Sequence, residues 1–178
     1  MRIRLTAAIL FIAAMLSVSC SDEDEERQPE WFPLRVGARW IYDAIADSVI
    51  STQDINGHTY YELAGYSLLW RGSLVRMNDL GQLMILGGDS EQVFFDFNAP
   101  AGSNWTLTSP HGPYQVSVEN RNLPNVVVPA GTFSGCYEFI FQSPAIDNSW
   151  HFIVAPQVGV VFKEGGFGFT YRLVRADL

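Results

Sequence analysis

The chain has 178 residues, of which 48% are hydrophobic and 17% charged, a composition typical of one folded domain rather than a disordered chain. Its net charge is −8 at pH 7. This excess of acids argues against nucleic acid as a partner and against electrostatic attraction to anionic lipid, because both require basic patches.

The first twenty residues have the features of an export signal. Arg2 and Arg4 precede an apolar run at residues 5–18, which is shorter than the roughly 20 residues that span a bilayer but suits a secretory signal. Ser17 and Ser19 then precede Cys20. The segment resembles a bacterial lipoprotein signal, in which such a cysteine becomes the lipidated N-terminus.

One position departs from that resemblance. Lipoprotein signals usually carry Leu three residues before the cysteine, where this chain has Ser17. Cleavage after Ser19 by an ordinary signal peptidase, which would release a soluble protein, therefore stays an alternative, and an uncleaved membrane anchor is a third. We expect a signal peptide at 1–19, a lipidated Cys20 with an acidic tether at 20–30, and a β-rich domain at 31–178.

Five of the nineteen acids lie in the tether at residues 22–26, directly after Ser21, and the composition of the tether predicts a solvated spacer. An acidic run directly after the cysteine also resembles a signal for export to the cell surface. Ser21 fits outer-membrane sorting of lipoproteins. We therefore expect an exported protein anchored in the outer membrane, on its periplasmic or its surface side.

Residues 31–178 alternate between apolar and polar side chains with a period of two, which predicts half-buried antiparallel strands. The pattern is clearest at residues 92–97, 114–119, 137–142 and 169–173. The predicted inward sets are Val93, Phe95 and Phe97; Tyr114, Val116 and Val118; Tyr137, Phe139 and Phe141; and Phe169, Tyr171 and Leu173. We expect a mainly β fold of nine or ten strands, a single antiparallel meander forming a curved sheet or an incomplete barrel. A short helix is expected only around 67–70.

Turn residues separate these strands. Asn56-Gly57 predicts a tight hairpin, and further turns are expected at 78–81, 87–89 and 165–166. The segments 33–40 and 100–105 share a Gly three residues before a Trp. This echo is explained either by two similar halves or by common turn chemistry.

Three blocks, FPLRVGARWIYD, VVVPAGTFSGCYEF and APQVGVVFKE, resemble blocks shared by uncharacterised bacterial secreted proteins and lipoproteins. The resemblance implies no activity and no catalytic residue. The family resembles the curved sheets of envelope lipoproteins and lipid carriers, which is an analogy of fold only.

No catalytic or metal-ligating pattern stands out. His58, His111 and His151 have no metal-ligand spacing, and no nucleophile elbow occurs. We expect His58 and His111 to be solvated loop residues, and His151 to be paired on the outer face or a rim. Cys136 is expected to be a buried apolar residue. We predict no catalytic residue, no metal and no cofactor, and the only assigned site is lipidation at Cys20.

The abundant aromatic residues predict a core, and strands that are apolar on both faces, around Phe94 and Ile140, require a cover on the second face. We therefore hypothesise an envelope lipoprotein that binds an apolar ligand or a protein partner in the concavity of the sheet. The alternatives are a structural subunit of a surface assembly and, less favoured, an envelope hydrolase with two titratable groups in one cleft.

Overall fold

Antiparallel strands make up most of the described chain, which confirms the predicted fold class. The computed structural model describes residues 30–65, 72–87, 90–109, 112–145, 148–166 and 168–178. The strands are β1 (Arg39–Tyr42), β2 (Ala46–Ile55), β3 (His58–Ala64), β4 (Ser73–Met77), β5 (Gln82–Gly87), β6 (Ser90–Asp96), β7 (Asn104–Ser109), β8 (Gly112–Leu123), β9 (Val126–Val128), β10 (Gly131–Phe133), β11 (Cys136–Gln142), β12 (Trp150–Ala155), β13 (Gly159–Gly165) and β14 (Phe169–Asp177). The count exceeds the nine or ten predicted partly because β9 and β10 are too short to show a period.

The described ranges contain no helix, and therefore no helix long and apolar enough to cross a membrane. The short helix expected around 67–70 lies outside the described residues.

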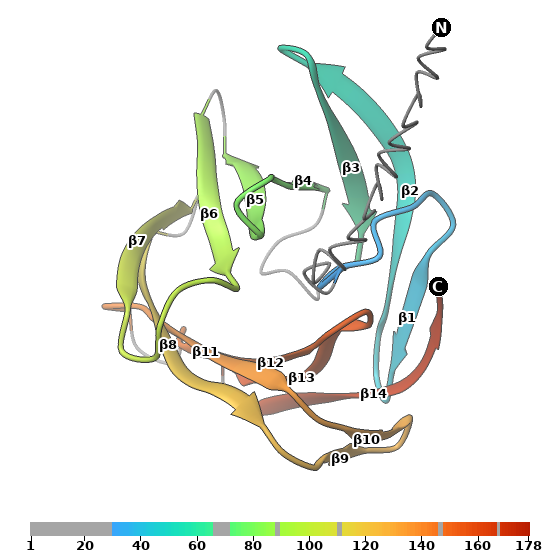
Figure 1. The fold of residues 1–178 in the computed structure, drawn as a ribbon, viewed down its shortest axis with the longest axis vertical. Helices are drawn as coiled ribbons and strands as arrows, with labels where there is room; N and C mark the ends of the chain where they lie inside the picture. The colour runs from blue at the N-terminus through green and yellow to red at the C-terminus, as the bar shows by residue number, and fades with distance from the viewer. Residues whose placement is uncertain (1–29, 66–71, 88–89, 110–111, 146–147, 167) are drawn as a thin grey trace, which may run out of the picture.

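Twelve strands form one sheet in the order β6-β5-β4-β3-β2-β1-β14-β13-β12-β11-β8-β7, which curls into a nearly closed barrel (Figure 1). The order consists of two six-stranded meanders, β1 to β6 and β7-β8-β11-β12-β13-β14. Pairing of β1 with β14 joins the two meanders. The small β9–β10 hairpin is inserted between β8 and β11.

The barrel has one seam, between β6 and β7, where the two ends of the sheet order meet without ladder pairing. Side chains cross this seam instead. The indole Nε1 of Trp105 on β7 donates to the carbonyl oxygen of Val93 on β6 over 2.8 Å. The incomplete barrel expected from the sequence is therefore an almost closed one.

The two meanders begin with the same turn. Gly37 (φ 93°) donates its N–H to the Val49 carbonyl, and Gly102 (φ 85°) donates to the Val118 carbonyl. In return, Val49 and Val118 donate to the residue that follows each glycine. Both glycines have the positive φ that an L side chain rarely adopts. The sequence echo thus marks equivalent entries into β1 and β7.

The predicted turns at 56–57 and 78–81 are present. Asn56 (φ 52°) and Gly57 (φ 80°) both have positive φ, as a two-residue type I′ turn between β2 and β3 requires. In the turn between β4 and β5, the Asn78 side-chain oxygen accepts the N–H groups of Leu80 and Gln82. The turn at 87–89 is described only up to Gly87.

The barrel interior is filled largely by aromatic rings, which confirms the predicted core. Six phenylalanines are fully buried and in mutual contact: Phe94, Phe95, Phe97, Phe139, Phe141 and Phe152. The inward sets on β8 and β11 are buried as predicted. On β14, Leu173 is buried, but Tyr171 is half-buried and Phe169 exposed.

The predicted alternation breaks on β6. Phe94 is fully buried together with Phe95, whereas Val93 is only half-buried. The pairing of β5 with β6 shifts between Leu83 and Met84, so that Phe94 is an extra residue in the ladder. Such a bulge lets two consecutive side chains face one core, which answers how the double-apolar strand around Phe94 is covered.

Candidate functional site

The first described residues, 30–34, do not pair with the sheet but pack into the barrel, where Figure 1 shows them inside the ring of strands. Trp31, Phe32 and Leu34 are all buried. The Trp31 ring stacks on Phe97 with centroids 4.5 Å apart and meets Tyr137 edge-on at 4.7 Å. We call residues 30–34 the plug segment, because its side chains fill this end of the barrel.

The turn between β12 and β13 holds the plug segment in place. Gln157 donates its backbone N–H to the Glu30 carbonyl over 2.7 Å, and the Trp40 indole donates to the Val158 carbonyl over 2.5 Å. A Cβ on Gly159 would lie only 3.0 Å from the Phe32 ring. Glycine at position 159 therefore leaves room for the Phe32 ring. Because Phe32 belongs to the first sequence block and Gly159 to the third, these two blocks pack against each other here.

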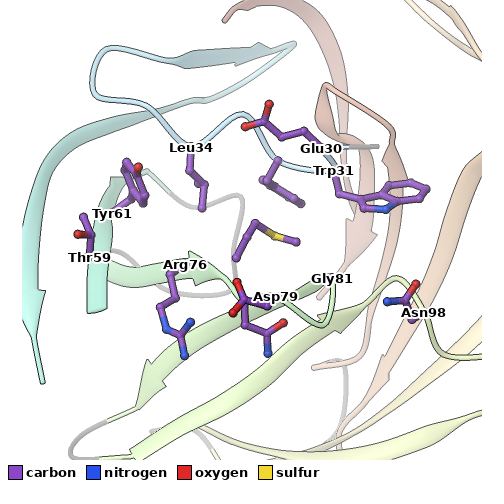
Figure 2. Close-up of a pocket in the computed structure, with 12 residues that line it drawn as sticks. Glu30, Trp31, Leu34, Thr59, Tyr61, Arg76, Asp79, Gly81 and Asn98 are labelled. Atoms are coloured by element: carbon purple, nitrogen blue, oxygen red, sulfur yellow. The ribbon is translucent and has the colours of Figure 1, made fainter. Parts of the chain in front are cut away.

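A pocket of about 500 Å³ lies beside the plug segment (Figure 2). Its lining comes from the plug segment, from β3 and β4, and from the turns that follow β4 and β6: Glu30, Trp31, Phe32, Leu34, Thr59, Tyr61, Arg76, Met77, Asn78, Asp79, Gly81 and Asn98. We call the barrel end formed by these turns and the β12–β13 turn the pocket end. Small-molecule sites are typically 300–1,000 Å³ with apolar walls and a few polar groups.

Hydrogen bonds fix the polar rim of the pocket. The Asn98 amide donates to the Leu80 carbonyl over 2.6 Å, and the Asn78 amide donates to the Gln82 side chain over 2.8 Å. A Cβ on Gly81, where φ is +69°, would lie 2.9 Å from the Asn98 amide nitrogen. The rim is therefore preorganised, with Asp79 exposed at its edge.

Arg76 is the cation of the pocket lining, and its charge is already matched. Its guanidinium makes two hydrogen bonds with Glu91, one of them from Nη2 to Oε2 over 2.7 Å, and the Tyr60 hydroxyl donates to the same carboxylate over 2.6 Å. The hydrogen bonds from Arg76 lower the pKa of Glu91, whereas burial raises the pKa of Tyr60. This pair is ionised near neutral pH, and the carboxylate of Glu91 offsets the charge of Arg76.

A second depression of about 490 Å³ lies between β7, β8 and the residues after β11. Its lining comprises Thr106, Pro113, Tyr114, Gln115, Gln142, Ser143 and Pro144. It offers one large ring and no ionisable carboxyl or amine in this lining. Its apolar surface is smaller than that of the pocket beside the plug segment, which makes it the weaker candidate site for an apolar ligand.

The residues singled out from the sequence do not gather at the pocket. Cys20 and His111 lie outside the described residues. His58 is exposed at the start of β3, and Cys136 is fully buried at the start of β11, as predicted for a structural thiol. Burial raises the pKa of Cys136 to about 11.

His151 is paired on the outer face, as predicted. Its Nε2 lies 2.7 Å from Glu138 Oε1, across the β11–β12 ladder, and Glu138 also accepts a hydrogen bond from Asn120. The pair brings together two titratable groups, but neither of the two pockets above includes them in its lining. The His151–Glu138 pair therefore lies apart from both of the pockets described here.

The second apolar face predicted around Ile140 carries half-buried side chains. Ile140, Ile153 and Phe162 are each partly exposed on the side of β11–β13 that also bears His151. The Phe162 ring contacts His151 with centroids 5.5 Å apart. We call these three residues the outer stripe.

An unexpected charged residue lies inside the barrel. Lys163 is 2% exposed, and its Nζ lies 4.2 Å from the centroid of the Trp150 ring and 5.7 Å from that of Tyr171. Burial lowers the pKa of Lys163 to about 8, although the buried carboxylate of Asp47 acts in the opposite direction. Lysines are usually exposed, so a sequence gives little reason to expect one inside a barrel. The only signal is the aromatic residues near Lys163, whose rings can hold a cation.

Among the described residues, no three His, Cys, Asp or Glu side chains gather as a metal site. The sequence did not predict the pocket residues as a site, because they come from four segments that lie far apart along the chain. The turn at 78–81 was predicted, but nothing in its spacing shows that the plug segment would fold against it.

No family model matches the chain, and no curated protein matches it. The family suggested by the three sequence blocks therefore stays a prediction. The chain is similar to two solved structures. A "putative exported protein with YmcC-like fold" from Bacteroides fragilis is 17% identical, with 85% of this chain and 100% of that chain covered and a TM-score of 0.45. A "putative lipoprotein" from Parabacteroides distasonis is 15% identical, with 84% and 99% covered and a TM-score of 0.38.

Exported proteins and lipoproteins are also the class that the N-terminal signal predicts. At these identities and TM-scores, the argument for this chain depends on its own residues.

Proposed function

We propose that this chain is an exported, lipid-anchored envelope protein that binds an amphiphilic ligand in the pocket beside the plug segment, without catalysing a reaction. The observation that carries the proposal is the pocket itself. It combines an apolar wall from Trp31, Leu34, Tyr61 and Met77 with a rim of fixed polar groups. That combination suits a ligand with an apolar body and a polar end.

The packed interior limits where such a ligand could lie. The phenylalanine core and the plug segment fill much of the concavity. A ligand in the pocket would therefore contact the plug segment on one side and β3–β4 on the other. From the sequence, the ligand was expected in the concavity of the sheet. We propose that it binds at the pocket end of the barrel.

The experiment is a titration with N-phenyl-1-naphthylamine, a dye that fluoresces in apolar sites. It uses residues 20–178 with Cys20→Ser, so that both the lipid anchor and the apolar run at 5–18 are absent. Met77→Glu places a charge on the pocket wall and should weaken binding at least tenfold, about 1.4 kcal/mol. Leu80→Glu is the matched control, because Leu80 is 66% exposed and outside the lining. Equal dye affinity in both variants would reject this pocket as the site.

The outer stripe favours a second candidate function, a structural subunit of an envelope assembly. A partner that covers Ile140, Ile153 and Phe162 would bury half-exposed apolar surface. Crosslinking in cells with a photoreactive residue at position 162 tests this. A crosslinked species that Ile153→Lys removes would support the candidate, and its absence would count against it.

A further inference from the structure

The chain leaves the barrel at the pocket. Glu30, the first described residue, lines the pocket, and its carbonyl is fixed by the N–H of Gln157. Trp31 and Phe32 directly after it are buried, so this exit point is held by packing as well. The tether to Cys20 therefore begins at the mouth of the pocket.

The length of the tether limits how the barrel can face the membrane. Ten residues separate Cys20 from Glu30, a reach of at most about 35 Å. The neighbouring strand β13 has seven residues and runs about 23 Å toward the opposite end of the barrel. Placing that opposite end on the membrane would use roughly two-thirds of the tether along the barrel wall. With the pocket end on the membrane, the full tether length stays free.

The charges around the pocket mouth restrict the ligand. The carboxylates of Glu30 and Asp79 line the pocket, and five further acids, at residues 22–26, precede Glu30 in the sequence. The guanidinium of Arg76 is held by Glu91. The field at the mouth is therefore negative, which disfavours an anionic headgroup and tolerates a zwitterionic or uncharged one.

We infer that the pocket end faces the membrane in which the chain is anchored, and that the ligand is a lipid with a zwitterionic or uncharged headgroup, taken from that membrane. The inference rests on the proposed function and on lipidation at Cys20. A lipid acyl chain supplies the apolar body that the Trp31, Leu34 and Met77 wall accepts, and its headgroup stays at the polar rim beside the bilayer surface.

Orientation is tested with the lipidated full chain in phosphatidylcholine vesicles that contain an acceptor-labelled lipid. A maleimide donor is attached to Leu80→Cys at the pocket end or to Phe169→Cys at the opposite end, both exposed positions. The buried thiol of Cys136 should stay unlabelled. Energy transfer from the label at position 80 should be at least twofold greater than from position 169. Equal or reversed transfer overturns the inference.

The ligand class is tested with vesicles whose lipids carry brominated acyl chains, which quench tryptophan on contact. Brominated phosphatidylcholine should quench the wild type more than Trp31→Phe, and brominated phosphatidylglycerol at the same surface fraction should quench Trp31 at least threefold less. Met77→Glu should abolish the Trp31-dependent quenching, whereas Phe169→Glu, at an exposed position of the opposite end, should not. Equal quenching by both lipids, or quenching that survives Met77→Glu, overturns the inference.

The two levels of the proposal fail differently. If the soluble Cys20→Ser chain binds the naphthylamine dye but the vesicle experiments give the contrary results, the pocket is a binding site and the membrane inference is wrong. If the dye itself does not bind, the proposed function is wrong.

Discussion

The side-chain amide of Gln92 on β6 bonds to both backbone groups of Thr108 on β7. Its Oε1 accepts the Thr108 N–H over 2.7 Å, and its Nε2 donates to the Thr108 carbonyl over 3.0 Å. A glutamine side chain thus supplies, at the seam, the pair of hydrogen bonds that a neighbouring strand would supply elsewhere in the sheet. The equivalent junction between β14 and β1 uses a backbone ladder instead.

Removal of this clamp should loosen the seam. We expect Gln92→Ala to lower the free energy of unfolding by about 1–2 kcal/mol, because two partly exposed hydrogen bonds are lost. Amide hydrogen exchange at Thr108 should become faster in native conditions. Gln53→Ala, on an exposed position of β2, is the control and should change stability by less than about 0.5 kcal/mol. Unchanged exchange at Thr108 would show that the seam does not depend on Gln92.

The plug segment should contribute strongly to stability. Trp31→Ala removes a buried ring that contacts Phe97 and Tyr137, and we expect a loss of about 3 kcal/mol in urea unfolding. Val127→Ala, at a position 73% exposed, is the control and should be nearly neutral. A loss below about 1 kcal/mol for Trp31→Ala would mean that the plug segment is not docked in solution.

The sequence predicts the strands and turns well because these depend on local physics. Alternation on β8 and β11 follows the two faces of a pleated strand, and Asn56-Gly57 tolerates the positive φ of its turn. It predicts the site poorly, because the pocket arises where the plug segment meets the turn after β4. Trp31 and Phe32 have no period that distinguishes a plug from a strand. The burial of Phe94 likewise depends on the bulge opposite Met84, which the alternation of apolar and polar residues does not reveal.

Cys136 should be unreactive in the native protein. Burial raises its pKa from 9.0 to about 11, so the thiolate fraction near pH 8 falls about 100-fold. With Cys20→Ser leaving a single thiol, Ellman's reagent should react slowly with the native chain and rapidly after unfolding in urea. Release of one equivalent of the coloured product within the mixing time, without denaturant, would contradict the burial of this residue.

Lys163 should make stability depend on pH in the alkaline range. Its folded pKa of about 8 lies below the unfolded value of 10.5, so between these values the unfolded state binds more protons. The contribution of Lys163 to the free energy of unfolding therefore rises with pH through that window, by up to about 3 kcal/mol in total. Cys136 acts in the opposite direction, because its folded pKa is raised and the unfolded thiol ionises first.

The measurement that isolates Lys163 is therefore a difference. Urea unfolding of the wild type and of Lys163→Met is compared from pH 7 to 9.5, below the range in which Tyr60 and Tyr114, with raised pKa values, titrate. The wild type should gain stability relative to the variant by up to about 1.4 kcal/mol per pH unit above pH 8. Lys163→Met combined with Asp47→Asn controls for the buried carboxylate that the single variant leaves behind. A constant difference across this range would mean that the amine titrates as an exposed lysine, which would place Lys163 outside the aromatic interior.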